Sequence, residues 1–293
     1  MRPPNNTQTA MRKTEILAPA KINLFLEVFP KGPTPSRTAL HPVETVIEKV
    51  TIFDRLSLQT TLSEIKIHSN IAKLNTPANL AFKAAALLKN TYRVKEGVRI
   101  RLDKKIPVAS GLGGGSSDAA AVLLALNRLW KIDEPVSRLF PLALQLGSDV
   151  PAFLTPGRCR VGGFGEKVKI LPVEKKLDYL LILTGIKSPT GLAYRQLDDL
   201  TYRPRSSKMM IAALKKGGTA EIAASLFNRF QEVLGEKNKE MKKWQALLRD
   251  NFGSSLLSGS GGSFFVLLTK KSAAVNLQKN GKKKFLAVTT FVL

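Results

Sequence analysis

The stretch from Pro107 to Trp130, PVASGLGGGSSDAAAVLLALNRLW, constrains the fold more than any other part of this 293-residue chain. Four glycines in five positions are followed by two serines and an aspartate, and then by an apolar stripe of helical period. Just upstream, Val98, Ile100 and Leu102 alternate with charged residues, as in a strand. The predicted order is therefore strand, glycine loop, helix.

This order predicts a phosphate site. Glycines let backbone N–H groups approach a ligand closely, and the helix that follows adds unpaired N–H groups and the positive end of its dipole. A side chain at Gly114 would then occupy the place of the phosphate. Ser116 and Ser117 either cap the helix or offer hydroxyls to a phosphate or to Mg²⁺. The alternative is a flexible loop with a serine N-cap, which four closely spaced glycines disfavour.

The loop differs from the common nucleotide-binding signatures. No lysine follows the glycines as it does in a Walker loop, and Ser116 stands where a dinucleotide fingerprint needs glycine. The HRD and DFG motifs of protein kinases do not occur in the sequence. The loop therefore predicts phosphate binding of another kind.

Composition bounds the class of protein. The chain is 44% hydrophobic and long enough for two domains with cores of their own. It has no run of about 18 apolar residues, and its N-terminus lacks the apolar region of a secretory signal. Met11 is an alternative start. A single cysteine, Cys159, excludes an internal disulfide and predicts a reducing, cytoplasmic setting.

The formal net charge of +24 makes nucleic-acid binding an alternative function. The lysines are scattered, however, and the one dense cluster is Lys282 to Lys284. No RNA-binding or DNA-binding motif accompanies them. We therefore expect no membrane and no specific nucleic acid as a partner, and we interpret the charge as favouring anionic small-molecule substrates.

Periodicity divides the chain into two halves. In the first half we expect a strand over 22–28 after a turn at Pro19, strands at 43–53 and 56–60 broken at 54–55, and helices at 79–90 and 136–146. In the second we expect strands at 179–183, 254–258, 263–269 and 285–292, with helices near 190–197, 207–215, 219–234, 238–249 and 272–280. Without the extra helices the second order is βαββαβ, the ferredoxin-like pattern. A boundary near Pro172 gives domains of 13–172 and 173–293.

Four polar residues stand out by position alone. Lys21 and Asn23 lie two apart in a strand and so point to the same face. Asn79 begins a helix, where an N-cap is its default role. Asp149 follows the helix stop at Gly147 and either caps the next short turn or has a functional role.

The central loop and three separated segments carry a resemblance to a known family. GLGGGSSDAA (111–120) resembles the central motif of the GHMP kinases, which are ATP-dependent kinases of small molecules. APAKINLFLEV (18–28) and LGSDVPAFL (146–154) are similar to segments of the family branch that phosphorylates a cytidyl sugar alcohol. SGSGGSFFVLL (258–268) resembles the C-terminal glycine motif of the GHMP kinases, and all the segments occur in the family's order. The resemblance implies an α+β, two-domain GHMP kinase fold. Its N-terminal domain would be ribosomal-protein-S5-like with a left-handed βαβ unit, and its C-terminal domain ferredoxin-like.

The resemblance also implies an activity, ATP-dependent phosphorylation of an alcohol in isoprenoid biosynthesis, with ATP as co-substrate and Mg²⁺ bridging its phosphates. Lys21 and Asp149 match the catalytic pair, and no protein metal ligand is assigned. The positions that match ATP-binding residues are Asn79, Lys104, Gly111, Leu112, Gly113, Gly114, Gly115, Ser116 and Ser117. The positions that match substrate-binding residues are Asn23, His41, Thr190 and Tyr194, with His41 reading cytosine and Tyr194 stacking on it.

Two positions depart from the family pattern. Leu40 stands where a second stacking aromatic is usual, which changes the expected pyrimidine site. Asp118 replaces the more usual asparagine at the start of the central helix, where a carboxylate is welcome. A mevalonate-type or homoserine-type kinase is the alternative within the family, and a basic nucleic-acid-binding protein is the alternative outside it. The sequence leaves the oligomeric state open.

Overall fold

A long antiparallel pair of strands forms the spine of the protein. The computed structural model describes residues 11–31, 41–172, 175–186, 190–198, 202–252, 255–268 and 284–291. Strands β1 (Lys13–Val28) and β2 (Val43–Thr61) pair along nearly their whole length. The predicted break at 54–55 is wrong, because β2 runs through it and Asp54 turns inward to bond the backbone of a neighbouring segment.

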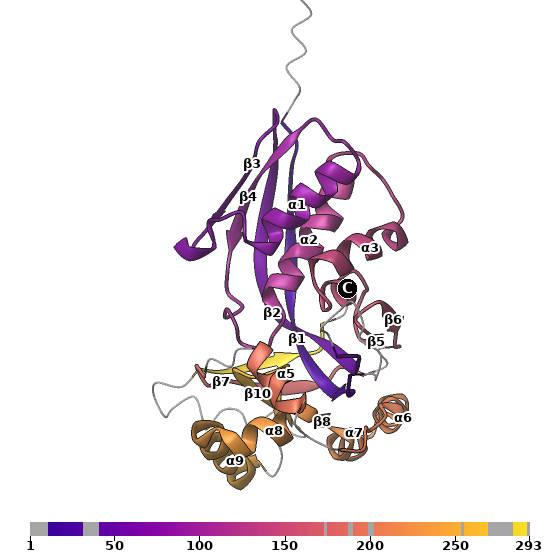
Figure 1. Ribbon diagram of the computed structural model, residues 1–293, viewed down its shortest axis with the longest axis vertical. Helices are drawn as coiled ribbons and strands as arrows, with labels where there is room; N and C mark the ends of the chain where they lie inside the picture. Colours follow the sequence, from indigo (N-terminus) through magenta and orange to yellow (C-terminus); the bar gives the residue numbers. More distant parts are fainter. Residues whose placement is uncertain are drawn as a thin grey trace, which may run out of the picture.

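The first sheet is built around this pair in the order β3-β4-β2-β1-β8, with β5 and β6 continuing from β2 (Figure 1). Strands β3 and β4 are parallel and flank helix α1, which is the predicted βαβ unit. The added strands are β3 (Ile65–Ser69), β4 (Gly97–Asp103), β5 (Cys159–Gly163), β6 (Lys167–Ile170) and β8 (Phe227–Asn228).

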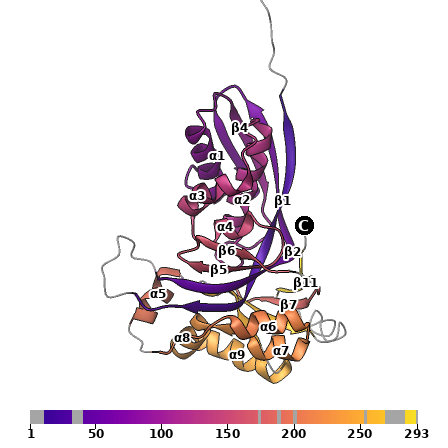
Figure 2. The same cartoon turned by 90° about the vertical axis from the view of Figure 1, so that its right-hand side faces the viewer.

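Helices cover one face of this sheet, as Figures 1 and 2 show. They are α1 (Leu80–Thr91), α2 (Gly114–Leu129), α3 (Val136–Leu146) and the short α4 (Val150–Phe153), and a 3-10 turn, η1 (Ala72–Leu74), precedes α1. Helix α2 is central because its alanines and leucines face both the sheet and the other helices, and nearly all of them are buried. A core of aliphatic residues from β2, β4 and these helices holds α2 in place.

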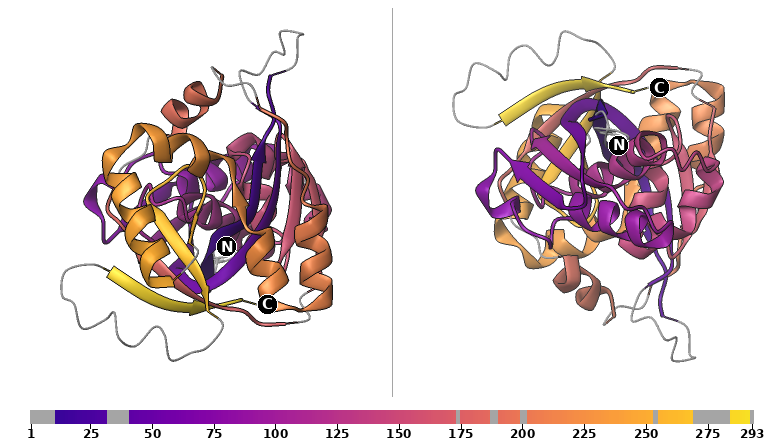
Figure 3. Two further views of the ribbon diagram at one scale, coloured as in Figure 1. Left: turned by 90° about the horizontal axis from the view of Figure 1, so that it is seen from below. Right: turned by 90° about the horizontal axis from the view of Figure 1, so that it is seen from above.

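The second sheet has the order β11-β7-β10-β9, which is the strand order expected of a ferredoxin-like βαββαβ chain. Its strands are β7 (Asp178–Leu183), β9 (Leu256–Leu257), β10 (Ser263–Leu268) and β11 (Lys284–Thr289). Strand β11 lies at its edge (Figure 3, yellow). The helix predicted at 272–280 lies outside the described residues.

Helices α5 (Thr190–Asp198), α6 (Lys208–Lys216), α7 (Thr219–Ser225), α8 (Arg229–Lys237) and α9 (Lys239–Phe252) complete the second half. The single helix predicted at 219–234 is wrong. It divides into α7 and α8 because Phe227 and Asn228 pair with β1 as a short parallel strand. The break places Asn228 as the N-cap of α8.

The two sheets are joined through β1 and β2. Aliphatic residues of both strands share one core with Tyr179, Leu181 and Phe265 of the second sheet. An isolated bridge links Val50 to Thr290, next to β11. The boundary near Pro172 stays a prediction. Across the described ranges, no helix combines the length and apolarity that crossing a membrane requires.

Candidate active site

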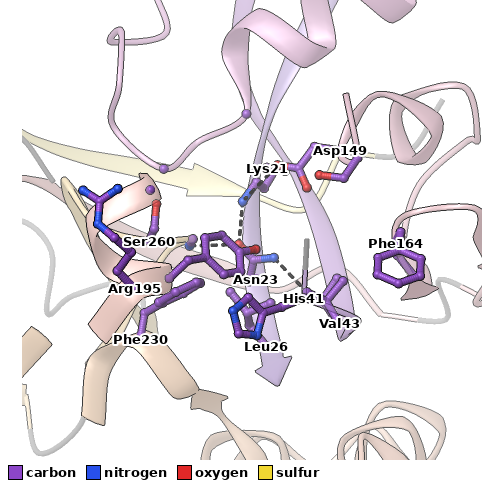
Figure 4. A pocket seen from close by; sticks show the side chains of 18 of the residues that line it. Lys21, Asn23, Leu26, His41, Val43, Asp149, Phe164, Arg195, Phe230 and Ser260 are labelled. Carbon is purple, nitrogen blue, oxygen red and sulfur yellow. Dashed lines mark hydrogen bonds and ion pairs between the residues drawn. The ribbon is translucent and has the colours of Figure 1, made fainter. Parts of the chain in front are cut away.

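Three polar side chains meet where β1 passes the start of α2 (Figure 4). The Nζ atom of Lys21 lies 2.5 Å from Oδ1 of Asn23 and 3.9 Å from Oδ2 of Asp149. Lys21 and Asn23 share a face of β1, as their spacing predicted. Oδ1 of Asn23 also accepts from the Gly259 N–H at 2.9 Å, and its Nδ2 donates to Thr45 Oγ1 at 2.9 Å. Asn23 thus holds both Lys21 and the loop that contains Gly259, the second glycine-rich loop of the chain.

Lys21 and Asp149 differ in their exposure. The Lys21 side chain is 3% exposed, whereas that of Asp149 is 43% exposed and open to a ligand. Burial lowers the pKa of Lys21, and the Asp149 carboxylate opposes that shift. Asp149 precedes α4, but its side chain makes no capping hydrogen bond. The structural explanation of Asp149 as a cap is therefore wrong.

Two glycine loops pack against each other beside this pair. A Cβ at Gly111 would lie 2.1 Å from the Ser258 carbonyl oxygen, and one at Gly113 would lie 2.9 Å from Phe153 Cζ. Both glycines have positive φ, at 80° and 69°. The Ser258 hydroxyl donates to the Gly111 carbonyl at 3.0 Å. Glycine is thus required at position 111, where the first half of the chain touches the second, and at position 113, where the loop packs on Phe153.

A cavity of about 510 Å³ opens over the first turn of α2. It is lined by Asn79, Lys104, Ser116, Asp118 and every glycine of the loop, among others. The N–H groups of the first turn and the dipole of α2 point toward this space, which suits a chain of phosphates. Asn79 also caps α1, as its position predicted, with Oδ1 accepting from the Ala81 N–H at 2.9 Å.

Lys104 lies beneath the glycine loop in a buried ion cluster. Its Nζ donates to Asp54 and, at 2.7 Å, to Oδ2 of Asp118. Oδ1 of Asp54 also accepts from the N–H groups of Lys105 and Ile106, which begin the segment leading to the loop. The cluster explains why residue 114 is a glycine. Its Cβ would lie 2.8 Å from Lys104 Nζ, so the expectation that a side chain there would point at phosphate is wrong.

A second cavity of about 610 Å³ lies on the other side of the loop and contains Lys21, Asn23 and Asp149 (Figure 4). Its far wall is aromatic: the Tyr194 ring stacks on His41 at 5.4 Å and meets Phe230 edge-on at 5.0 Å. His41 Nδ1 is 3.0 Å from the Phe29 carbonyl oxygen. A base can stack on Tyr194 only by using a ring face that His41 leaves free or by displacing His41.

The predicted residues fall on both cavities, with some exceptions. Ser117 is buried and lines a third cavity, behind α2, so its position does not favour the predicted phosphate contact. Leu112 is a buried core residue. Thr190 begins α5, and nothing is described of its side chain. Leu40 lies outside the described residues.

Three residues of the second cavity were not predicted from the sequence. Asp198 lies 2.9 Å from His41 Nε2 and 2.8 Å from Lys31 Nζ. Its pKa is lowered chiefly by the hydrogen bond from Lys31. Arg195 and Phe164 also line this cavity. They come from α5 and from the turn after β5, so only the tertiary fold brings them to Lys21.

The comparisons with known proteins agree with this geometry. The models "GHMP kinases N terminal domain" and "GHMP kinases C terminal" match residues 79–157 and 210–286. The chain is therefore built as a GHMP kinase, with the α+β two-domain fold that the sequence predicted.

Individual relatives narrow the class. The 4-diphosphocytidyl-2-C-methyl-D-erythritol kinase of Symbiobacterium thermophilum is 37% identical over 90% of this chain and 93% of its own length. A crystal structure of 4-(cytidine 5'-diphospho)-2C-methyl-D-erythritol kinase is 31% identical, with a TM-score of 0.77 over 95% of this chain and 100% of that one. A homoserine kinase from Cytophaga hutchinsonii, 19% identical with a TM-score of 0.72 over 96% and 95%, shares the fold. The chain belongs to the 4-diphosphocytidyl-2-C-methyl-D-erythritol kinase family.

Proposed function

We propose that this chain transfers the γ-phosphoryl group of ATP to the 2-hydroxyl of 4-diphosphocytidyl-2-C-methyl-D-erythritol, in the methylerythritol phosphate route to isoprenoid precursors. The observation that carries the proposal is the shared wall: Gly111 and Gly113 line both the cavity over α2 and the cavity that holds Lys21 and Asp149. A nucleotide on one side and an alcohol on the other would meet at this loop. The family of the relatives supports the choice of alcohol.

Asp149 is the group suited to accept the hydroxyl proton, because its carboxylate is open to the cavity and is not used as a cap. Lys21 lies beside it, fixed by Asn23, where its charge stabilises the carboxylate and the alkoxide that develops during transfer. Phosphoryl transfer depends mainly on such positioning and charge neutralisation. The two residues therefore act as one unit.

The cavity over α2, which would hold the nucleotide and is called the nucleotide cavity below, offers few metal ligands of its own. Within the described ranges, no group of three or more His, Cys, Asp or Glu side chains is placed to hold a metal. Ser116, whose side chain is on the wall of this cavity, is the hydroxyl suited to Mg²⁺ carried by ATP. That ion would neutralise phosphate charge during transfer.

Recognition of the cytidyl group would fall to the aromatic wall formed by Tyr194, His41 and Phe230. Arg195 is the nearby cation suited to the diphosphate. A cytoplasmic location and the absence of a specific nucleic-acid partner stay predictions.

The test is ADP release measured across candidate alcohols. The purified chain should turn over ATP with the cytidyl alcohol and not with mevalonate or homoserine. Faster turnover with either of the latter would assign the chain to a different GHMP activity. RNA retention that depends on salt, without turnover of any alcohol, would instead favour the nucleic-acid alternative.

A further inference from the structure

A third cavity lies behind the catalytic loop, between the early part of β1 and one face of α2. Its volume is about 550 Å³, close to that of each active-site cavity. It is a groove that follows a helical stripe through Ser117, Ala121, Leu124 and Arg128, positions spaced by three or four residues. From Ser117 to Arg128 the helix rises roughly 16 Å. The groove therefore has the length of an extended chain of about ten carbons with a polar group at each end.

The middle of the groove is apolar. Ala121, Leu124 and Ala125 of α2 line it together with Ile16 of β1, which packs against the same core. Upstream of Phe25, the edge of β1 that faces away from β2 has no partner strand among the described residues. An apolar ligand chain would cover this surface.

The outer end of the groove is cationic. Arg128 and Lys131 are exposed there, and no carboxylate of the described residues forms an ion pair with either. Arg12 lies at the same end, where its Nη2 is ion-paired with Glu96 while its buried Nε has no hydrogen-bond partner among those residues. The one carboxylate in the lining, Glu15, already contacts Lys13 and Arg55. An anionic group would therefore meet unpaired positive charge.

The inner end carries an unsatisfied donor. The Ser117 side chain is 1% exposed, and its hydroxyl has no hydrogen-bond partner within the described structure. A buried polar group left in this state costs about 1–3 kcal/mol. Phe153 closes this end and separates it from Gly113. An oxygen at the far end of a ligand would satisfy Ser117.

We propose that the groove between β1 and α2 is a binding site for a small amphipathic anion, namely an apolar chain with a phosphate at one end and an oxygen acceptor near the other. The phosphate lies against Arg128 and Lys131, and the chain runs inward toward Ser117. The site is separate from both active-site cavities and does not depend on the proposed reaction.

The probe is 10-hydroxydecyl phosphate, titrated as a monomer into the full chain by calorimetry. One site should fill, and it should fill equally when a non-hydrolysable ATP analogue occupies the nucleotide cavity. Decyl phosphate should bind several-fold more weakly, because it leaves Ser117 unpaired. Decyltrimethylammonium, which reverses the charge of the head, should not bind.

Two variants locate the site. Leu124→Trp should block the groove and abolish binding. Arg128→Glu combined with Lys131→Glu, both on exposed positions, should weaken binding roughly tenfold or more. Lys83→Glu, an exposed lysine of α1 outside the groove, is the matched charge control and should leave binding unchanged.

Three results would overturn the proposal. Displacement of the probe by the ATP analogue would mean that its phosphate sits on the glycine loop. Unchanged binding in the double charge variant would remove the cationic end from the site. Co-sedimentation with phosphatidylglycerol vesicles through the same residues, without binding of the free probe, would make the groove a membrane contact.

Discussion

The catalytic roles proposed for Lys21 and Asp149 can be tested by substituting each side chain. Asp149 makes no capping bond, so its removal should leave α4 intact. Asp149→Asn should keep the melting temperature and ATP binding near those of the parent, while kcat falls by about 10²–10⁴-fold through loss of the proposed general base. Steady-state kinetics and thermal unfolding measure the two effects separately.

Lys21→Met is the companion variant. Because the two side chains are proposed to act as a unit, the double variant should be little slower than either single one. Substantial turnover in Asp149→Asn would remove Asp149 from the role of base.

The glycine loop offers a matched pair of substitutions. Gly115 lines the cavity over α2, and among the described residues outside the backbone of α2 a Cβ there would meet Leu80 Cδ1 alone, at 3.6 Å. Gly115→Val should therefore fold normally and bind ATP about tenfold or more weakly, as calorimetry would show. Gly114→Val should instead lower stability by about 1–3 kcal/mol, because its side chain would collide with Lys104 and Ile106. Equal melting temperatures in the two variants would contradict this assignment.

Spacing alone predicted that Lys21 and Asn23 share a face and that Asn79 caps a helix, because both are local properties of the chain. Asp54 and Asp198 were not found. Each reaches its partner across the fold, Asp54 about 50 positions before Lys104 and Asp198 far from His41. Nothing in the adjacent sequence marks such contacts.

At the scale of elements, the start of α2 rests on two carboxylates and one lysine. Asp118, Asp54 and Lys104 are all buried, and Oδ1 of Asp118 has no hydrogen-bond partner among the described residues. The pKa of Asp118 is raised to about 7, mainly by burial, with Asp54 adding to the rise and Lys104 opposing it. The cluster therefore carries one negative charge too many when Asp118 ionises.

This excess charge predicts a pH dependence. A carboxyl whose pKa is raised by folding stabilises the protein below its unfolded pKa of about 4, and that contribution is lost as pH rises through about 7. Asp118→Asn should leave the free energy of unfolding nearly unchanged at acidic pH and raise it by about 2–4 kcal/mol near pH 8. Urea unfolding at both pH values would measure it. The same gain in the free energy of unfolding at acidic pH and near pH 8 would contradict the ionisation of Asp118 between these two values.

Elements were predicted well where the pattern is local and poorly where a distant partner decides. The helix at 136–146 has the observed bounds because its periodicity and the stop at Gly147, directly after it, are both local signals. The pattern over 219–234 gave no sign of the break at Phe227 and Asn228, because that break depends on pairing with β1. Asp54 and Arg55 looked like a turn because the buried partners of Asp54 are remote in sequence.

At the scale of the whole molecule, a buried ion pair fastens the second half to the first. Glu27 of β1 accepts from Nε of Arg229 of α8 at 2.8 Å and from its Nη2 at 2.7 Å, and both side chains are buried. Arg229→Met should lower the free energy of unfolding by about 3–5 kcal/mol, because it leaves the Glu27 charge unpaired.

Adding Glu27→Gln should restore part of that loss, because it removes the buried unpaired charge and its amide oxygen can still accept from the Val28 N–H, although the Arg205 N–H loses its acceptor. Chemical denaturation of the three variants gives the comparison. Additive losses would show that the pair is not coupled.

The glycine wall between the two cavities also determines how the ligands can arrive. Gly111 and Gly113 separate two chambers that each have room for a ligand, so neither ligand needs to leave before the other enters. Both substrates would be present together, and the phosphoryl group would pass directly between them without resting on the protein. Double-reciprocal plots of initial rate against alcohol concentration, measured at several ATP concentrations, should therefore give intersecting lines. Parallel lines would indicate a ping-pong mechanism, in which a covalent phosphoenzyme forms before the alcohol reacts.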